Sequence, residues 1–407
     1  MRRRGVALVV AGLVIAAACS SDDSGDADAA QDGGATGGAA DVDEPTASLG
    51  PVEPGAEWDV QPPEEQGMDA ATLEEAREYA FAEGQNTQGV VVVRNGVIVA
   101  EWYADGADES SWAASWSMAK SFTSALIGIA IEEGLIPSVD EPMTTYYPQW
   151  EGTSRQDITL RDVLQMASGL DFTESYDPAN IETSDIIQMV LFQEDQLAYA
   201  ADRPYLREPG TVFNYSSGDT QLLSGVIEQV TGMKTSEYAQ EKLFDPIGIE
   251  QVEWWEDARG HTLTYCCLDT TSRNFARFGW LYLNAGAWGD EQVVQEDWVA
   301  ESLTPSESEE GYGYKWWLTG RVDTELPNDT FSARGHDGQF TYVIPSLDLV
   351  VVRNGTYIKY DGEPVADPNL FGKYPNSVVP ELGTVGPEEG WDDAEFLTPI
   401  VSAVSEP

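Results

Sequence analysis

Ser117 and Lys120 lie three residues apart in the stretch Ser115–Phe122, just ahead of an apolar run that ends at Gly134. This pattern predicts a buried helix closed by a glycine, with both side chains on one face of its first turn. A serine hydroxyl becomes a nucleophile when a nearby base takes its proton, and burial favours the neutral, basic form of a lysine. The pair could therefore perform acyl transfer, with the helix N-terminus stabilising an oxyanion. Taken alone, the same spacing also fits an ordinary polar helix start.

Tyr215 lies in a short polar turn, Phe213–Asp219, just before a predicted helix. A tyrosine presented by such a turn could share a proton with Lys120 and act as a general acid and base. A surface turn with a packed tyrosine is the simpler interpretation of this stretch by itself. Tyr215 is therefore a candidate only in combination with the other residues.

The segment Gly335–Gln339 places His336 and Asp337 between two glycines at the start of a predicted hairpin. Glycines on both sides suggest a close approach of the backbone to another group. A strand that begins there could aim the N–H group of Gln339 at the same site. The chain has two histidines, and neither His336 nor His261 has the spacing of a metal motif. The sequence therefore predicts a site without a metal.

The chain of 407 residues carries 71 acidic and 21 basic residues, which gives a formal net charge of −50. Its apolar content of 42% and its 13 tryptophans support a large core in one composite domain or two domains. So strong a negative charge repels nucleic acid and anionic lipid and keeps the chain soluble. Because no basic patch is present, we expect no nucleic-acid partner.

Residues 1–18 have the pattern of a signal peptide, because Met1–Arg4 is basic and Gly5–Ala18 is apolar. Cys19 follows three alanines, which resembles a bacterial lipobox. The alternative is an ordinary cleaved signal with an incidental cysteine. Residues 19–66 are rich in Asp, Ala, Gly, Glu and Pro and should form a disordered acidic tether. We therefore expect an exported protein, lipid-anchored to the outer face of the bacterial cell membrane, which it contacts only through that anchor.

Cys266 and Cys267 are adjacent in the chain. A disulfide between neighbours closes a strained eight-membered ring, so we expect two buried thiols. Export nevertheless makes oxidation of the pair possible.

The elements that must position these residues come from both ends of the chain. Hydrophobic spacing predicts helices near 69–84, 158–170, 184–191, 220–231, 236–243, 274–284 and 392–404, and strands near 89–94, 97–102, 339–344 and 348–353. This order predicts an α+β fold, in which an antiparallel sheet built from both chain ends carries flanking helices and an all-α part is inserted. The folded domain would span 67–407, with its α/β part at 67–120 and 256–407 and its helical part at 121–255. A site would then lie at the seam between the two parts.

In this order, the pieces resemble the serine beta-lactamase and penicillin-binding protein superfamily over about residues 65 to 400. The resemblance is strongest to class C-like hydrolases of the 6-aminohexanoate-dimer (nylon-oligomer) hydrolase and esterase branch. The set of phrases is specific, although each phrase alone is not. The phrases are Ser115–Ser121, Leu160–Leu164 with Ser168–Leu170, Asn214–Gly218, Ala276–Gly279 with Leu281–Leu283, Tyr312–Trp317 and Gly335–Gly338.

The resemblance implies a role for each residue of the proposed centre. Ser117 would be the acylated nucleophile, Lys120 its proton acceptor and Tyr215 the class C-type tyrosine. The N–H groups of Ser117 and Gln339 would form the oxyanion hole. The family chemistry needs no metal or organic cofactor.

Two departures from the family pattern bear on the substrate. Class C enzymes have Tyr-x-Asn and Lys-Thr-Gly, whereas this chain has Ser217 in place of the asparagine and His336-Asp337-Gly338 in place of Lys-Thr-Gly. The family lysine helps to hold the carboxylate of a beta-lactam, so its loss favours esters or amides. His336 and Gly338 would support the site, and Asp337 is a candidate for substrate binding. Tyr176 is another, because a loop tyrosine binds the leaving amine in nylon-oligomer hydrolases.

We therefore expect a secreted serine hydrolase that cleaves a small ester or amide substrate through an acyl-serine intermediate. One alternative is a beta-lactamase or DD-peptidase that acts on penicillins or wall peptides. Another is a catalytically silent ligand-binding lipoprotein that retains the scaffold. An active-site serine probe separates the silent protein from the enzymes.

Lipidation at Cys19 is directly testable by intact-mass analysis of the membrane fraction. The basic and apolar segments ahead of Cys19 predict a mature chain that begins at this residue with a diacylglyceryl group attached. Cys19→Ser should release the protein from the membrane fraction. A soluble wild-type product with an unmodified N-terminus would contradict the anchor and leave plain secretion.

Overall fold

The structure, a computed structural model, describes residues 54–55, 57–177, 180–359 and 383–405. The expected signal peptide, Cys19 and most of the acidic tether lie outside these residues. Within the described ranges, no helix has both the length and the apolar character needed to cross a membrane. The folded domain begins before residue 67, so the tether is shorter than predicted. Trp58 is buried in the core, and its indole N–H donates to the Arg273 carbonyl at 3.1 Å.

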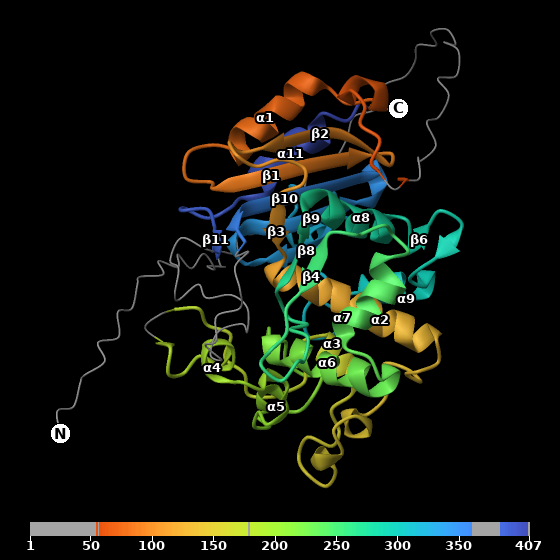
Figure 1. The fold of residues 1–407 in the computed structure, drawn as a ribbon, viewed down its shortest axis with the longest axis vertical. Helices are drawn as coiled ribbons and strands as arrows, with labels where there is room; N and C mark the ends of the chain where they lie inside the picture. Colours follow the sequence, from red (N-terminus) through yellow and green to blue (C-terminus); the bar gives the residue numbers. More distant parts are fainter. Residues whose placement is uncertain (1–53, 56, 178–179, 360–382, 406–407) are drawn as a thin grey trace, which may run out of the picture.

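A large antiparallel sheet brings the two ends of the chain together (Figure 1). Its strand order is β2-β1-β10-β9-β8, and β11 pairs with β10. In the central pair, Val91 of β1 lies opposite Val352 of β10. The predicted α+β fold is therefore confirmed. The strands of this sheet are β1 (Thr87–Arg94), β2 (Val97–Tyr103), β8 (Phe331–Gly335), β9 (Gln339–Ile344), β10 (Leu349–Ile358) and β11 (Gly383–Val385).

Smaller strands lie outside the large sheet. One three-stranded sheet has the order β3-β5-β4, and β6 pairs with β7. The three-stranded sheet is important for the site because β3 leads directly into the turn that contains Ser117. These strands are β3 (Trp112–Ala114), β4 (Val252–Trp254), β5 (Leu268–Thr271), β6 (Ala287–Trp288) and β7 (Glu291–Gln292).

Four consecutive valines of β1, residues 90–93, give the large sheet two apolar faces, because successive side chains of a strand point to opposite sides. Val90 and Val92 pack in the core that includes the two terminal helices, α1 and α11. Val91 and Val93 belong to the larger core on the other face, with α2 and α8. The bounds of these helices are α1 (Ala70–Ala80), α2 (Ala119–Glu132), α8 (Ser272–Leu283) and α11 (Asp393–Ser402).

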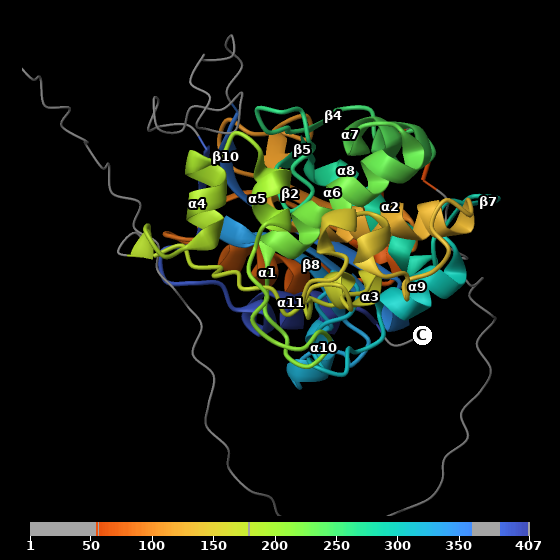
Figure 2. The same ribbon diagram turned by 90° about the horizontal axis from the view of Figure 1, so that it is seen from below.

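The inserted helical part follows α2 and lies at the far side from α1, in the lower half of Figure 1. Figure 2 shows the molecule from that side. Leu164 of α3 and Leu222 of α6 belong to the same core as Val91 of the sheet. One continuous core therefore joins both parts. The other helices are α3 (Leu160–Leu164), α4 (Asp185–Phe192), α5 (Gln196–Ala201), α6 (Ser217–Thr231), α7 (Thr235–Ala239), α9 (Glu296–Ser302) and α10 (Thr319–Val322).

The largest differences from the predicted elements are at short segments. Strand β8 was not predicted, because Phe331–Gly335 is only five residues long and contains no β-branched residue. The helix expected over 158–170 is confined to the five residues of α3. The helix expected over 236–243 ends at Ala239 and continues as a π-helical turn, Gln240–Phe244.

Candidate active site

Ser117 lies in a short 3-10 turn, Trp116–Met118, directly ahead of α2. The sequence pattern placed it inside the first helical turn. The difference arises at Trp116, whose φ of 42° departs from a helical path. Ser115 anchors the turn, because its N–H donates to the Leu268 carbonyl at 2.8 Å and its hydroxyl accepts from the Leu268 N–H at 2.9 Å. Backbone conformations of this kind persist where the surroundings impose them, and they concentrate at functional sites.

Lys120 is in the first turn of α2, and only 1% of its surface is exposed. Its Nζ donates to Ser117 Oγ at 2.9 Å, to Ser217 Oγ at 3.1 Å and to the Tyr265 carbonyl at 2.9 Å. Burial lowers the pKa of Lys120 to about 8, although the negative charge of Glu174 acts in the opposite direction. A fraction of the lysine is therefore neutral at pH 7 and able to take a proton from Ser117.

Tyr215 is half-buried just before α6. The centroid of its ring lies 5.0 Å from Lys120 Nζ, and its hydroxyl is hydrogen-bonded with Ser117. Burial and the charge of Glu174 raise the pKa of Tyr215, and the hydrogen bond with Ser117 offsets this only in part. The phenol therefore stays protonated at neutral pH. It can donate a proton, whereas the base that activates Ser117 is Lys120.

Glu174 is a carboxylate of the cluster that the sequence did not reveal. Its Oε1 accepts from Ser217 Oγ at 2.7 Å, and its Oε2 accepts from the Ser217 N–H at 2.9 Å. The hydroxyl of Tyr176 also donates to Oε1, at 2.7 Å, and the Tyr176 ring centroid is 5.1 Å from that of His336. Tyr176 therefore lies at the predicted site. Tyr176 follows Glu174 by two residues in the chain. This proximity to a predicted site residue is the signal that could have distinguished Glu174 from the other acidic residues, of which the chain has 71 in total.

The turn between β8 and β9 lies against the turn that contains Ser117. A Cβ atom at Gly335 would lie 2.2 Å from the Ser115 carbonyl oxygen, so this approach requires glycine. Gly338 has a φ of 73°, and a Cβ there would lie 2.0 Å from Arg353 Nη1. Arg353 donates to the carbonyls of Asp337 and Gly338 at 3.1 and 2.7 Å. The buried guanidinium therefore braces the turn from behind.

His336 and Asp337 form a polar edge of the site. His336 Nδ1 lies 2.7 Å from Asp337 Oδ1, and the Thr384 hydroxyl donates to Oδ2. The Trp116 indole donates to Thr384 Oγ1 at 2.8 Å, which ties this edge to the residue before Ser117. Burial raises the pKa of Asp337, but contacts with His336, the Thr384 hydrogen bond and the charge of Arg353 together outweigh burial, so the pKa lies below its usual value. Asp337 is therefore a carboxylate at neutral pH.

Gln339 begins β9, opposite Gly335 in the register of β8 and β9. Its side-chain oxygen accepts from Asn354 Nδ2 at 2.9 Å. The use of its N–H group in an oxyanion hole stays a prediction. The contacts described above connect most of the predicted residues, which are Ser117, Lys120, Tyr215, Tyr176, His336, Asp337 and Gly338.

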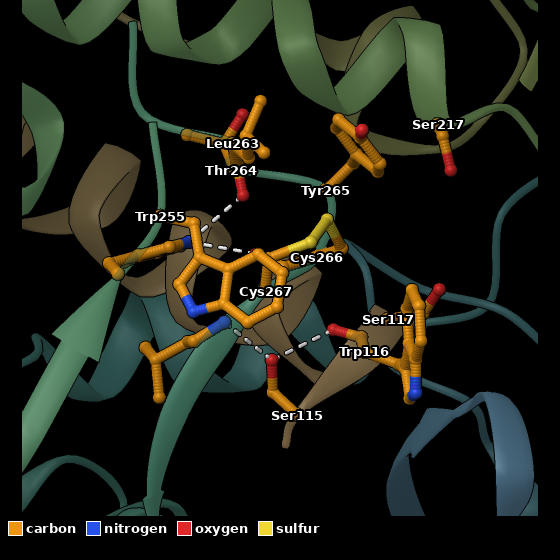
Figure 3. The surroundings of a disulfide bond; sticks show 12 residues. Ser115, Trp116, Ser117, Ser217, Trp255, Leu263, Thr264, Tyr265, Cys266 and Cys267 are labelled. Carbon is orange, nitrogen blue, oxygen red and sulfur yellow. Dashed lines mark hydrogen bonds between the residues drawn. A yellow bond between two sulfur atoms is a disulfide. The ribbon is translucent and has the colours of Figure 1, made fainter. Parts of the chain in front are cut away.

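Cys266 and Cys267 are joined by a disulfide, so the expectation of two buried thiols is wrong. Both residues are buried, and the φ of 68° at Cys267 provides the sharp turn that adjacent sulfurs need in order to meet. The pair lies between Tyr265, whose carbonyl accepts from Lys120, and Leu268, which anchors the turn of the predicted nucleophile (Figure 3). The disulfide therefore lies in a loop that contacts both Lys120 and the turn that contains Ser117.

Known proteins that are similar to this chain indicate its family and its fold. Residues 64–357 match the family model for beta-lactamase. A 6-aminohexanoate-dimer hydrolase from Paenarthrobacter ureafaciens is 26% identical over 289 residues, which cover 66% of this chain and 72% of the relative. A solved structure of a putative 6-aminohexanoate-dimer hydrolase from Bacillus anthracis has a TM-score of 0.61 at 23% identity and covers 75% of this chain and 83% of its own. A solved structure of a class C beta-lactamase from Rhodobacter sphaeroides has a TM-score of 0.53 at 17% identity and covers 71% of this chain and 95% of its own. The structural similarities concern the fold alone.

The electrostatics of the cluster predict how the reactivity of Ser117 depends on pH. Its rate of modification by a neutral fluorophosphonate should rise with pH through about 8, because only neutral Lys120 accepts a proton. Glu174→Gln removes a negative charge that favours the ammonium form of Lys120. The pKa of Lys120 should therefore fall, and the rise in the modification rate should occur at lower pH. Rates measured across neutral and alkaline pH check this shift.

Glu182→Gln is the matched control, because it neutralises an exposed carboxylate of the same segment. This control should leave the pH of that rise unchanged. If the modification rate of Glu174→Gln rises at the same pH as that of the wild type, or at higher pH, the coupling between Glu174 and Lys120 is contradicted.

Proposed function

The chain belongs to the beta-lactamase family, and on that premise we propose that it is an exported serine hydrolase that cleaves small esters or amides through an acyl-serine intermediate. The observation that carries the proposal is the contact of buried Lys120 with the Ser117 hydroxyl at 2.9 Å. Burying an ammonium group costs folding free energy, and packing contacts alone do not compensate for this cost. A general base, in contrast, benefits from this burial, because its pKa moves toward the working pH.

Acylation begins when Ser117 Oγ attacks the substrate carbonyl and Lys120 takes the hydroxyl proton. The new bond joins Oγ to the carbonyl carbon, and the carbonyl electrons move to the oxygen, where N–H groups of Ser117 and Gln339 would stabilise the anion. The intermediate then expels the alcohol or amine, which takes a proton from Tyr215. Lys120 returns a proton to the tyrosine through the hydrogen-bonded cluster, so the lysine is neutral when acylation ends.

Hydrolysis of the acyl-enzyme repeats these steps with water in place of the leaving group. Water loses a proton to the cluster as it attacks the acyl carbon, and Ser117 recovers a proton as the acid leaves. Glu174 binds the hydroxyl and N–H of Ser217, and Ser217 in turn accepts from Lys120. We therefore assign Glu174 and Ser217 to the positioning of the base during both halves of the reaction.

The charges near Lys120 support neutral or cationic substrates over anionic ones. The histidine that replaces the family lysine is paired with the carboxylate of Asp337. Glu174 adds a second carboxylate, and the whole chain carries a net charge of −50. The carboxylate of a beta-lactam would meet this negative potential without the fixed cation that the family provides. An ester or amide without a carboxylate avoids that repulsion.

The proposal also includes the place where the enzyme acts. The basic start of the chain, the apolar segment and Cys19 support export and lipid attachment. The acidic residues that follow would then form a solvated spacer between the membrane and the catalytic domain. No organic cofactor or metal takes part in the steps above.

Ser117→Ala should abolish both hydrolysis and fluorophosphonate labelling, because the attacking oxygen is lost. Ser124→Ala is the matched control, since Ser124 is a buried serine of the following helix, α2, and its hydroxyl has no hydrogen-bond partner among the described residues. Activity on a short-chain p-nitrophenyl ester and gel-based labelling provide the measurements. A folded Ser117→Ala protein that still hydrolyses the ester would refute the assigned nucleophile.

The substrate preference predicts that kcat/KM for a short-chain p-nitrophenyl ester exceeds that for nitrocefin by at least about tenfold, or about 1.4 kcal/mol in transition-state stabilisation. The physical reason is the repulsion between the lactam carboxylate and the carboxylates of Asp337 and Glu174. Both substrates are measured at the same pH and salt concentration. Nitrocefin turnover that equals or exceeds ester turnover would favour a beta-lactamase instead.

A further inference from the structure

The loop 262–268 lies directly against the reacting pair, and all seven of its residues are buried. The Tyr265 carbonyl accepts from Lys120 Nζ at 2.9 Å. Three residues later, the Leu268 carbonyl accepts from the Ser115 N–H at 2.8 Å, and the Leu268 N–H donates to Ser115 Oγ at 2.9 Å. One short segment therefore holds both the base and the turn of the nucleophile.

The loop is also tied to the two helices that contribute to the cluster around the base. The Thr123 hydroxyl of α2 donates to the Thr264 carbonyl at 2.8 Å. The Thr264 hydroxyl in turn donates to the Thr220 carbonyl of α6 at 2.8 Å. The part of the loop that precedes Tyr265 is therefore fixed to α2 and α6.

The disulfide occupies the whole interval between the two anchors of the loop. Only Cys266 and Cys267 separate Tyr265 from Leu268, and their sulfurs are bonded to each other (Figure 3). A bond between neighbouring side chains closes a ring that includes the peptide group between them, so it restricts the backbone torsions there. The placement of one anchor relative to the other therefore depends on this ring.

Reduction would change the shape of this segment. Bonded sulfurs lie about 2.0 Å apart, whereas the sulfurs of two thiols approach only to van der Waals contact, which is farther. Because Cys266 and Cys267 are buried, the added separation displaces neighbouring atoms. The carbonyls of the two cysteines are held by the Trp254 indole at 2.9 Å and the Trp255 N–H at 3.0 Å. We therefore expect the flanking anchors to absorb the movement.

We propose that the Cys266–Cys267 disulfide is a redox-controlled positioning element of the catalytic centre. In the oxidised protein the ring holds the two anchors so that Lys120 and Ser117 are aligned, and in the reduced protein the anchors shift and Ser117 reacts slowly. This inference rests on the proposed hydrolase function and adds a control of the same site. A reducing cytoplasm would keep the cysteines as thiols, so the hydrolase would become active only in an oxidising compartment.

A dithiol is the class of reductant that converts the oxidised state into the reduced state. Its thiolate attacks one sulfur of the pair, a mixed disulfide forms, and the other cysteine leaves as a thiolate that takes up a proton. The second thiol of the reductant then displaces the remaining cysteine, and the reductant ends as a cyclic disulfide. The protein thus gains two electrons and two protons, which the dithiol supplies.

The test is a redox titration of the purified full-length protein under native conditions, in buffers with increasing ratios of reduced to oxidised dithiothreitol. Alkylation and peptide mass analysis give the reduced fraction of Cys266 and Cys267. Fluorophosphonate labelling and hydrolysis of a p-nitrophenyl ester give the reactivity of Ser117. Both rates should fall at least about tenfold, with the same midpoint as the loss of the disulfide, because a displacement of about 1 Å can cost about a hundredfold in rate. Reoxidation should restore both rates.

A double variant, Cys266→Ser with Cys267→Ser, separates loss of the ring from other effects of the reductant. Serine is close to cysteine in size and cannot form the ring, so this variant should react slowly in oxidising and in reducing buffer. Cys19→Ser is the matched control, because it removes the third cysteine of the chain and leaves the ring intact. It should retain the wild-type rate and the wild-type response to dithiothreitol.

Near-UV circular dichroism distinguishes positioning from stabilisation. The reduced wild type and the double variant should keep the aromatic signals of a folded protein. Full reactivity in a folded protein that lacks the disulfide overturns the inference. Global unfolding also overturns it, because the disulfide would then contribute to stability alone. A disulfide that stays intact at every ratio of dithiothreitol excludes control by redox state.

The oxidised wild-type protein separates failure of this inference from failure of the proposed function. If the oxidised protein neither hydrolyses the ester nor reacts with the fluorophosphonate, the proposed function is refuted. If it does both, and its reactivity does not depend on the disulfide, only the positioning role is refuted.

Discussion

The requirement to keep the ammonium group of Lys120 out of water, yet within reach of Ser117, shapes the structure around it. Helix α2 is buried along nearly its whole length between the sheet and the inserted helices. The acceptors for Lys120 come from distant parts of the chain, with Ser217 at the start of α6 and the Tyr265 carbonyl on a loop. The two parts of the fold must therefore meet at this side chain before it can have a lowered pKa.

Backbone conformations around Lys120 show how firmly the surroundings are fixed. Trp116, Cys267 and Asp337 all have positive φ, although none of them is glycine. Each has a hydrogen-bond partner. Thr384 Oγ1 accepts from the Trp116 indole, the Trp255 N–H donates to the Cys267 carbonyl at 3.0 Å, and Arg353 donates to the Asp337 carbonyl. Strained conformations of this kind persist only where neighbouring contacts determine them. The site is therefore held by contacts between segments as well as by the helix that contains Lys120.

The sequence predicted features that depend on local pattern. The Ser-x-x-Lys spacing predicted Ser117 and Lys120 as the reacting pair, and the valine-rich segment 89–94 predicted a strand, which is β1 in the structure. The pattern could not locate Glu174 or Arg353, because isolated charges in a chain with 71 acidic and 21 basic residues have no local signature. An argument from ring strain favoured two buried thiols over a disulfide, although export left oxidation of the pair open. That argument took no account of the positive φ at Cys267.

The protonation of Lys120 is the central claim, and heteronuclear NMR of selectively labelled lysine measures it directly. Lys120→Met identifies the resonance of this side chain, and a pH titration of the wild-type protein gives its pKa. A midpoint near 8 agrees with a buried base that is partly neutral at physiological pH. A midpoint at about 10.4 or above, as for a lysine in water, would contradict the role of Lys120 as the base that activates Ser117.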